Sequence, residues 1–142
     1  ILCDRAKLGG ILVESSVDRR DAGALAVIGI GLNLARHPDI EGRPATDLAS
    51  LGASIAPLNL LAYLDESMQN WISNWASGEG FDRVRREWLA RSFSPGVGLT
   101  VNSGHGVVQG MFAGLDPGGA LLLTDATGRL LTVTFGDVAL AS

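Results

Sequence analysis

Two apolar stretches near the start of the chain, residues 8–16 and 24–34, have the pattern of β-strands. Each is almost continuous in Leu, Ile, Val and Gly over a strand's length, which is typical of strands buried on both faces. The polar residues 17–23 between them end in glycine and predict an exposed hairpin connection. The pattern therefore predicts two paired, central strands.

The middle of the chain has helical spacing instead. Apolar residues recur every three or four positions from Pro57 to about Ala76, which predicts one helix, and the Gly-rich break at 78–80 separates it from a second. The second helix is expected to bury Phe81, Val84, Trp88 and Leu89. Because the Trp and Met residues follow this spacing, they are expected to be core residues, while the arginines of the second helix face solvent.

The residue pattern changes near residue 94, where short runs of strand-forming residues begin to alternate with turn-forming residues. Strands are expected over 97–102, 106–114, 120–125, 129–135 and 138–141. So many short strands in so few residues predict a small antiparallel barrel of SH3-like type. The fold class is thus α+β, with one domain over 1–94 and a second over 95–142.

Composition narrows the function classes. The chain has 142 residues, 46% of them hydrophobic, and a net charge of −4, with no clustered Lys and Arg for a nucleic-acid surface. No apolar run reaches the roughly 20 residues of a membrane helix. One cysteine, Cys3, excludes an internal disulfide; we expect it to be a small buried strand residue, and the cytoplasm is the simplest compartment.

Several residues could carry chemistry. Lys7 precedes the first strand and could place a cation in a pocket, or could be an ordinary turn residue in solvent. Gly9 and Gly10, like Gly29 and Gly31, could leave a slot for a ligand or permit tight packing of a helix across the sheet. Asn33, beside an irregular loop over 37–46, could face an adenine edge or cap the loop's own backbone.

Other chemistries are not indicated. His37 and His105 lack carboxylate or thiol partners at metal-ligand spacing, so both are expected to be surface residues and no metal site is predicted. Neither a Ser-His-Asp nor a Cys-His arrangement can be assembled. The Gly-x-Gly at 29–31 is not a dinucleotide fingerprint, because no third glycine and no helix start follow it.

Taken in order, these signals resemble a known family. The most specific part is Lys7-Leu8-Gly9-Gly10-Ile11-Leu12-Val13-Glu14 followed by Gly29-Ile30-Gly31-Leu32-Asn33. With the Pro44-Ala45-Thr46-Asp47-Leu48 segment, two helices and a small barrel, the chain is similar to biotin–protein ligases. The resemblance implies the end of a catalytic domain related to class II aminoacyl-tRNA synthetases, with a mixed sheet and helices, followed by an SH3-like C-terminal domain.

That resemblance implies a function. The family activates biotin with ATP to biotinyl-AMP and passes the biotinyl group to a lysine of a biotin carboxyl carrier protein; Mg²⁺ is expected as well. By position, Lys7 would contact the biotin carboxylate and the adenylate phosphate. Gly10, Ile11, Gly29 and Gly31 would line the biotin slot, and Asn33 would face the adenine. The resemblance also allows a homodimer.

The family's Gly/Arg-rich loop and its Trp-Pro-Asn-Asp segment would lie ahead of Ile1. We therefore expect residues 1–142 alone to be inactive or weakly active, because binding energy must come from groups they lack. Two other functions remain open: a lipoyl or octanoyl transferase, and a non-catalytic binding or dimerisation module of the same fold.

Overall fold

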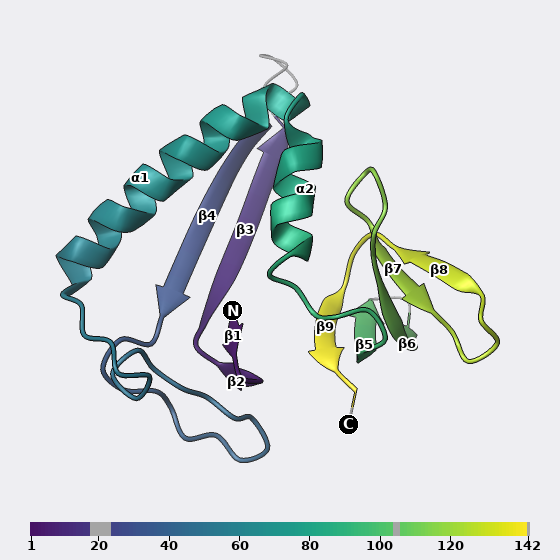
Figure 1. Cartoon of the computed structure of the whole chain (residues 1–142), viewed down its shortest axis with the longest axis horizontal. Coiled ribbons are helices and arrows are strands. Elements are labelled where there is room, and N and C mark those ends of the chain that lie inside the picture. The colour runs from purple at the N-terminus through teal and green to yellow at the C-terminus, as the bar shows by residue number, and fades with distance from the viewer. Residues whose placement is uncertain (18–23, 104–105, 142) are drawn as a thin grey trace. The chain divides into compact units, whose positions relative to one another are not determined.

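The structure is a computed structural model that describes residues 1–17, 24–103 and 106–141 (Figure 1). The chain divides into two compact units, Ile1–Glu66 and Ser67–Ser142. The predicted domain boundary at residue 94 lies inside the second unit and stays a prediction.

The first unit is built on two antiparallel pairs of strands. They are β1 (Leu2–Cys3), β2 (Ala6–Lys7), β3 (Gly9–Val17) and β4 (Ala24–Leu32). β3 and β4 lie side by side in register from Gly9 opposite Leu32 to Val17 opposite Ala24 (Figure 1). The predicted strand pair is therefore confirmed, although most of the expected connection over 17–23 falls outside the described residues.

The expectation that these strands are buried on both faces is wrong for this structure. β3 and β4 pair only with each other in the described sheet. Apolar side chains from both faces are exposed, among them Leu12 at 65%, Val13 at 59% and Leu25 at 65%. A continuous apolar pattern shows that a strand is suited to burial, but it does not supply the layers that bury it. Cys3, expected to be buried, is half-buried.

Two helices follow, as the spacing predicts. They are α1 (Pro57–Trp75) and α2 (Phe81–Leu89), with a short 3-10 turn, η1 (Ala76–Gly78), between them. Ala76 and Ser77 have positive φ angles of 47° and 56°, which end the first helix. Neither helix has a fully buried residue, so the expectation that their aromatic residues form a core is wrong for Trp75 and Trp88, which are 47% and 49% exposed.

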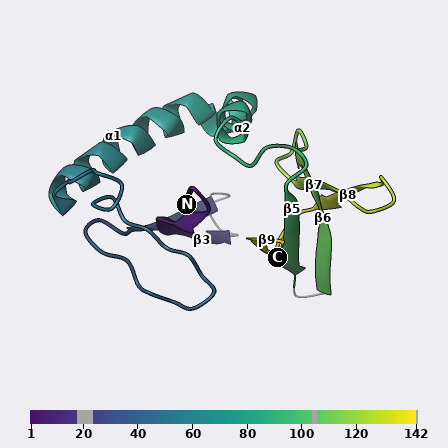
Figure 2. The same cartoon turned by 60° about the horizontal axis from the view of Figure 1, so that its bottom comes forward.

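The second unit has its core in a five-stranded antiparallel sheet, part of which Figure 2 shows from a second direction. Its strands are β5 (Gly98–Ser103), β6 (Gly106–Leu115), β7 (Leu121–Thr124), β8 (Leu130–Val133) and β9 (Asp137–Leu140). Leu99, Val101, Phe112 and Leu123 are buried together on one face, as period-two alternation requires. All five predicted strands are confirmed.

The strand order is β8-β7-β6-β5-β9, so β8 and β9 are the edges of the described sheet. No pairing between these two edges closes the sheet within the described residues. The observed fold is a mixed arrangement of helices and sheets, and the closed SH3-like barrel stays a prediction.

Within this unit α2 packs on the sheet. The Arg85 guanidinium donates to the Leu115 carbonyl, from Nε at 3.1 Å and also from Nη2. The ring of Phe81 lies over Gly119, where a Cβ would come within 2.8 Å of the ring. Arg85 is therefore a packing residue that satisfies a backbone acceptor, contrary to the expectation that the arginines of this helix only face solvent.

Candidate functional site

The hairpin register gathers three of the predicted glycines on one face. Gly10 lies opposite Gly31, and Leu12 lies opposite Gly29. Since side chains alternate between faces along a strand, positions 10, 12, 29 and 31 share one face of the hairpin. We call Gly10, Gly29 and Gly31 the glycine floor. A Cβ added at Gly31 would meet no atom within 4 Å, so the floor is open above this residue.

Lys7 lies at the end of this floor. Its Cε is 4.0 Å from the place that a Cβ on Gly10 would occupy, and its side chain is exposed. Ile11 pairs with Ile30 and projects from the opposite face, 57% exposed. The structure therefore brings Lys7 and the three glycines together, and it does not place the Ile11 side chain with them.

Glycine is required at position 9 by the packing of the two strands. A Cβ at this position would lie 2.3 Å from the Gly31 carbonyl oxygen and 2.7 Å from the Leu32 side chain. Both distances are impossible for real atoms, so only glycine permits this close approach of the two strands. Of the first glycine pair, Gly9 serves packing and Gly10 leaves the floor open.

The side-chain amide of Asn33 caps backbone carbonyl groups, which was one of the two roles that the sequence left open for this residue. Its Nδ2 donates to the carbonyl of Thr46 at 2.9 Å and to that of Lys7 at 3.3 Å. The main-chain carbonyl of Asn33 in turn accepts from the Leu48 N–H at 3.0 Å. Asn33 therefore joins the end of β4 to Lys7 and to the segment over residues 44–48.

That segment also holds the main chain of Lys7 directly. The Lys7 N–H donates to the Pro44 carbonyl at 2.8 Å, and the Thr46 N–H donates to the Lys7 carbonyl at 3.0 Å. Lys7 and Ala45 form a parallel β-bridge. We call residues 44–48 the backing segment, because it fixes both backbone groups of Lys7.

Asp47, inside the backing segment, is buried, with 3% of its surface exposed. Its Oδ1 accepts from the Ser50 N–H at 2.7 Å, as a capping carboxylate does, and its Oδ2 lies 2.7 Å from His37 Nδ1. The Ser50 amide and the His37 ring lower the pKa of Asp47, outweighing the effect of burial. An ionised carboxylate only accepts, so Nδ1 of His37 is the donor.

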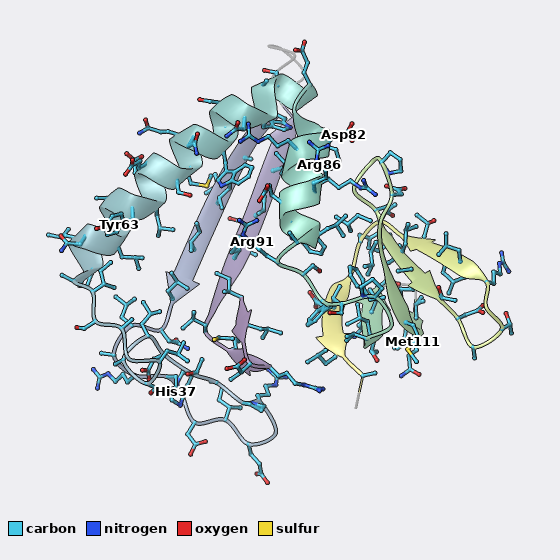
Figure 3. The ribbon with its side chains drawn as sticks, viewed as in Figure 1. His37, Tyr63, Asp82, Arg86, Arg91 and Met111 are labelled. Atoms are coloured by element: carbon cyan, nitrogen blue, oxygen red, sulfur yellow. The ribbon has the colours of Figure 1, made fainter. Side chains whose placement is uncertain are left out.

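The sequence did not predict this pair, since it indicated only that His37 lies at the surface without carboxylate or thiol partners at metal-ligand spacing. His37 lies in the irregular segment that follows β4, labelled in Figure 3, and it is ten residues from Asp47 in sequence. No periodicity marks a pair at that separation in a loop. The one sequence signal was an Asp three residues before a Ser at the start of a turn. His105 lies outside the described residues.

Acid should weaken this arrangement. Because the folded pKa of Asp47 lies below its ordinary value, the carboxylate stabilises the fold above that value, and the contribution is lost as the pH falls through the folded pKa. We therefore expect the thermal stability gap between the natural protein and Asp47→Asn to close below about pH 4. Melting temperatures measured from pH 6 to pH 2.5 test this; a constant gap would contradict it.

Three further features of the described residues concern a cavity, metal binding and membrane insertion. Residues 37–45 line a cavity of about 350 Å³. Among the residues that the structure describes, no three His, Cys, Asp or Glu side chains gather as a metal site would require. In the described part, neither helix is both long and apolar enough to cross a membrane.

Comparison with known proteins gives the family. Residues 96–140 match the biotin protein ligase C terminal domain. The chain is 33% identical over 135 residues to the biotin–acetyl-CoA-carboxylase ligase of Paracoccus denitrificans, covering 91% of this chain and 55% of that protein. It is 31% identical over 141 residues to the enzyme of the same name from Mycobacterium tuberculosis, covering 97% of this chain and 49% of that protein.

A solved structure supports the fold. The biotin protein ligase of Aquifex aeolicus, in complex with biotin and ATP, has a TM-score of 0.76 at 18% identity, over 96% of this chain and 57% of that one. Fold and site together define an α+β protein with a lysine beside a glycine-floored hairpin. The chain is a member of the biotin protein ligase family, as the sequence motifs predicted, and spans about half the length of the relatives it matches.

Proposed function

We propose that the protein activates biotin with ATP and transfers the biotinyl group to a lysine of a biotin carboxyl carrier protein. The observation that carries the proposal is the Lys7 side chain beside the open glycine floor. The relatives named as biotin–acetyl-CoA-carboxylase ligases support the choice of substrate, and the biotin and ATP complex of the Aquifex protein supports ATP as the activating molecule.

Lys7 would act in the first step. A biotin carboxylate oxygen attacks the α-phosphorus of ATP, the bond to the pyrophosphate oxygen breaks, and biotinyl-AMP and pyrophosphate result. Negative charge gathers on the phosphate oxygens during this step, and a positioned ammonium group stabilises it. The Lys7 main chain is bonded on both sides to the backing segment, so its side chain starts from a fixed point.

The glycine floor would hold biotin. The planar ureido group of biotin can approach the backbone closely where no Cβ stands in the way, and Gly10, Gly29 and Gly31 leave such a strip. Ile11 projects from the other face, so we assign it a backbone contribution to the slot at most. Since Asn33 Nδ2 already donates to two carbonyls, we assign any adenine contact to its Oδ1.

In the second step, the carrier lysine amine attacks the acyl carbon of biotinyl-AMP. The bond to the phosphate oxygen breaks, AMP leaves, and the amine loses a proton as the amide forms. We place this reaction in the cytoplasm. Mg²⁺, which the resemblance implies, would be held mainly by the ATP phosphates and water, and we assign it no ligand among the described residues.

Adenylate formation by the full-length protein tests the proposal directly. Labelled biotin and ATP should give labelled biotinyl-AMP and pyrophosphate, and adding a carrier domain should move the label onto protein. Tight binding of lipoate without biotin would favour a lipoyl or octanoyl transferase. Binding of biotin without any adenylate would leave a non-catalytic binding module.

A further inference from the structure

The pair formed by His37 and Asp47 closes a loop around the backing segment. His37 lies at the start of that loop and Asp47 at its end, with their side chains 2.7 Å apart. The neighbour of Asp47 on one side, Thr46, forms hydrogen bonds with Lys7 and Asn33. Its other neighbour, Leu48, forms a hydrogen bond with Asn33. A displacement of Asp47 therefore moves the residues that hold the Lys7 main chain.

We propose that His37 is a positioning residue that keeps Lys7 in place through Asp47 and the backing segment. The effect on catalysis rests on the proposed function, whereas the effect on the position of the Lys7 main chain is independent of it. The carboxylate of Asp47 divides its two oxygens between the Ser50 amide and His37, so loss of His37 leaves one oxygen of a buried charge without this donor.

The path from His37 to Lys7 consists of two short hydrogen bonds and one stretch of backbone, all within one compact unit. It runs from the imidazole to Asp47, along the backbone to Thr46, and across the 3.0 Å bond to the Lys7 carbonyl. The Lys7 side chain, by contrast, is exposed. Its position over the glycine floor depends on where its backbone is held.

Two substitutions of His37 separate the hydrogen bond from the side chain's bulk. An asparagine amide nitrogen occupies about the place of imidazole Nδ1, so His37→Asn keeps a donor to Asp47, whereas His37→Ala removes it. His37 is at the surface, so neither change fills or empties a core. Asp47 itself is a less specific test of this path, because replacing it also removes the acceptor of the Ser50 N–H.

Hydrogen–deuterium exchange on the full-length protein, followed by mass spectrometry of peptides containing Lys7 and Thr46, tests the structural part. We expect His37→Ala to speed exchange of these amides about fivefold, as loss of one hydrogen bond would. His37→Asn should match the natural protein. Unchanged exchange in His37→Ala, or equal acceleration in both variants, would overturn the proposal whether or not the protein makes biotinyl-AMP.

Turnover tests the catalytic part. We expect His37→Ala to lower kcat for adenylate formation about tenfold and His37→Asn to stay near the natural value. In a Lys7→Ala background, His37→Ala should have no further effect, because its influence passes through Lys7. Additive losses would contradict positioning. If the natural protein forms no adenylate, the proposed function fails, and amide exchange alone decides the role of His37.

Discussion

Replacing Lys7 with alanine should lower the rate of biotinyl-AMP formation about 10²-fold or more while the protein stays folded. The side chain is exposed, and its removal leaves both main-chain bonds of residue 7 to the backing segment in place. What is lost is the ammonium group beside the glycine floor. Pyrophosphate release, measured with saturating biotin and ATP, reports the change.

Two companion variants make this result specific. Lys7→Arg keeps the charge but replaces a compact ammonium with a broad planar group, so activity should fall between those of lysine and alanine. Arg5→Asn removes a neighbouring cation at a positive φ of 67°, a conformation that asparagine tolerates, and should leave the rate unchanged. An equal loss in Arg5→Asn would point to net charge rather than to Lys7.

The strand pair and the two helices were predictable because each has its own local pattern. Residues 8–16 and 24–34 are almost continuous runs of apolar, β-branched and Gly residues, and the observed β3 and β4 agree closely with them. The helical spacing after Pro57 likewise gave α1 and α2. Local pattern decides local structure wherever propensity and hydrophobic spacing agree.

Burial and face were less predictable, because both depend on partners. Ile11 and Gly10 are adjacent in sequence, and only the observed pairing with Ile30 and Gly31 shows which of them shares a face with Gly29. A one-residue shift in register would exchange the two faces. The apolar pattern of β3 also did not predict how much of the strand's side-chain surface the rest of this chain would cover.

The supporting residues of the site were the hardest to predict. His37 and Asp47 meet across an irregular loop, where no repeat relates one position to another. Asn33 had two open alternatives, and its bonds to the Thr46 and Lys7 carbonyls show the capping role. Such contacts follow from the path of the whole loop, so the sequence motifs included Lys7, Asn33 and residues 44–48 but did not predict the hydrogen bonds that join them.

Adding a side chain to the floor should block biotin without harming the fold. Gly31→Val places a β-branched residue in a strand with extended backbone, at a position where a Cβ meets nothing within 4 Å. We expect biotin binding to weaken about 10²-fold, because the valine methyl groups occupy the space proposed for the ring, while the melting temperature is unchanged or higher. Calorimetric titration with biotin alone measures this.

The matched control places the same side chain, valine, elsewhere on β4. Ala26 pairs with Ser15 and shares the face of Ile11 and Val13, opposite the glycine floor. Ala26→Val should therefore leave biotin affinity within about twofold of the natural value.

If Gly31→Val binds biotin normally, the ligand does not lie on the glycine floor, and Lys7 would have to act from a site on another surface. If both variants lose binding, the hairpin as a whole has been disturbed, and Gly10→Ala, a smaller addition on the same face, would then distinguish a blocked floor from a distorted strand.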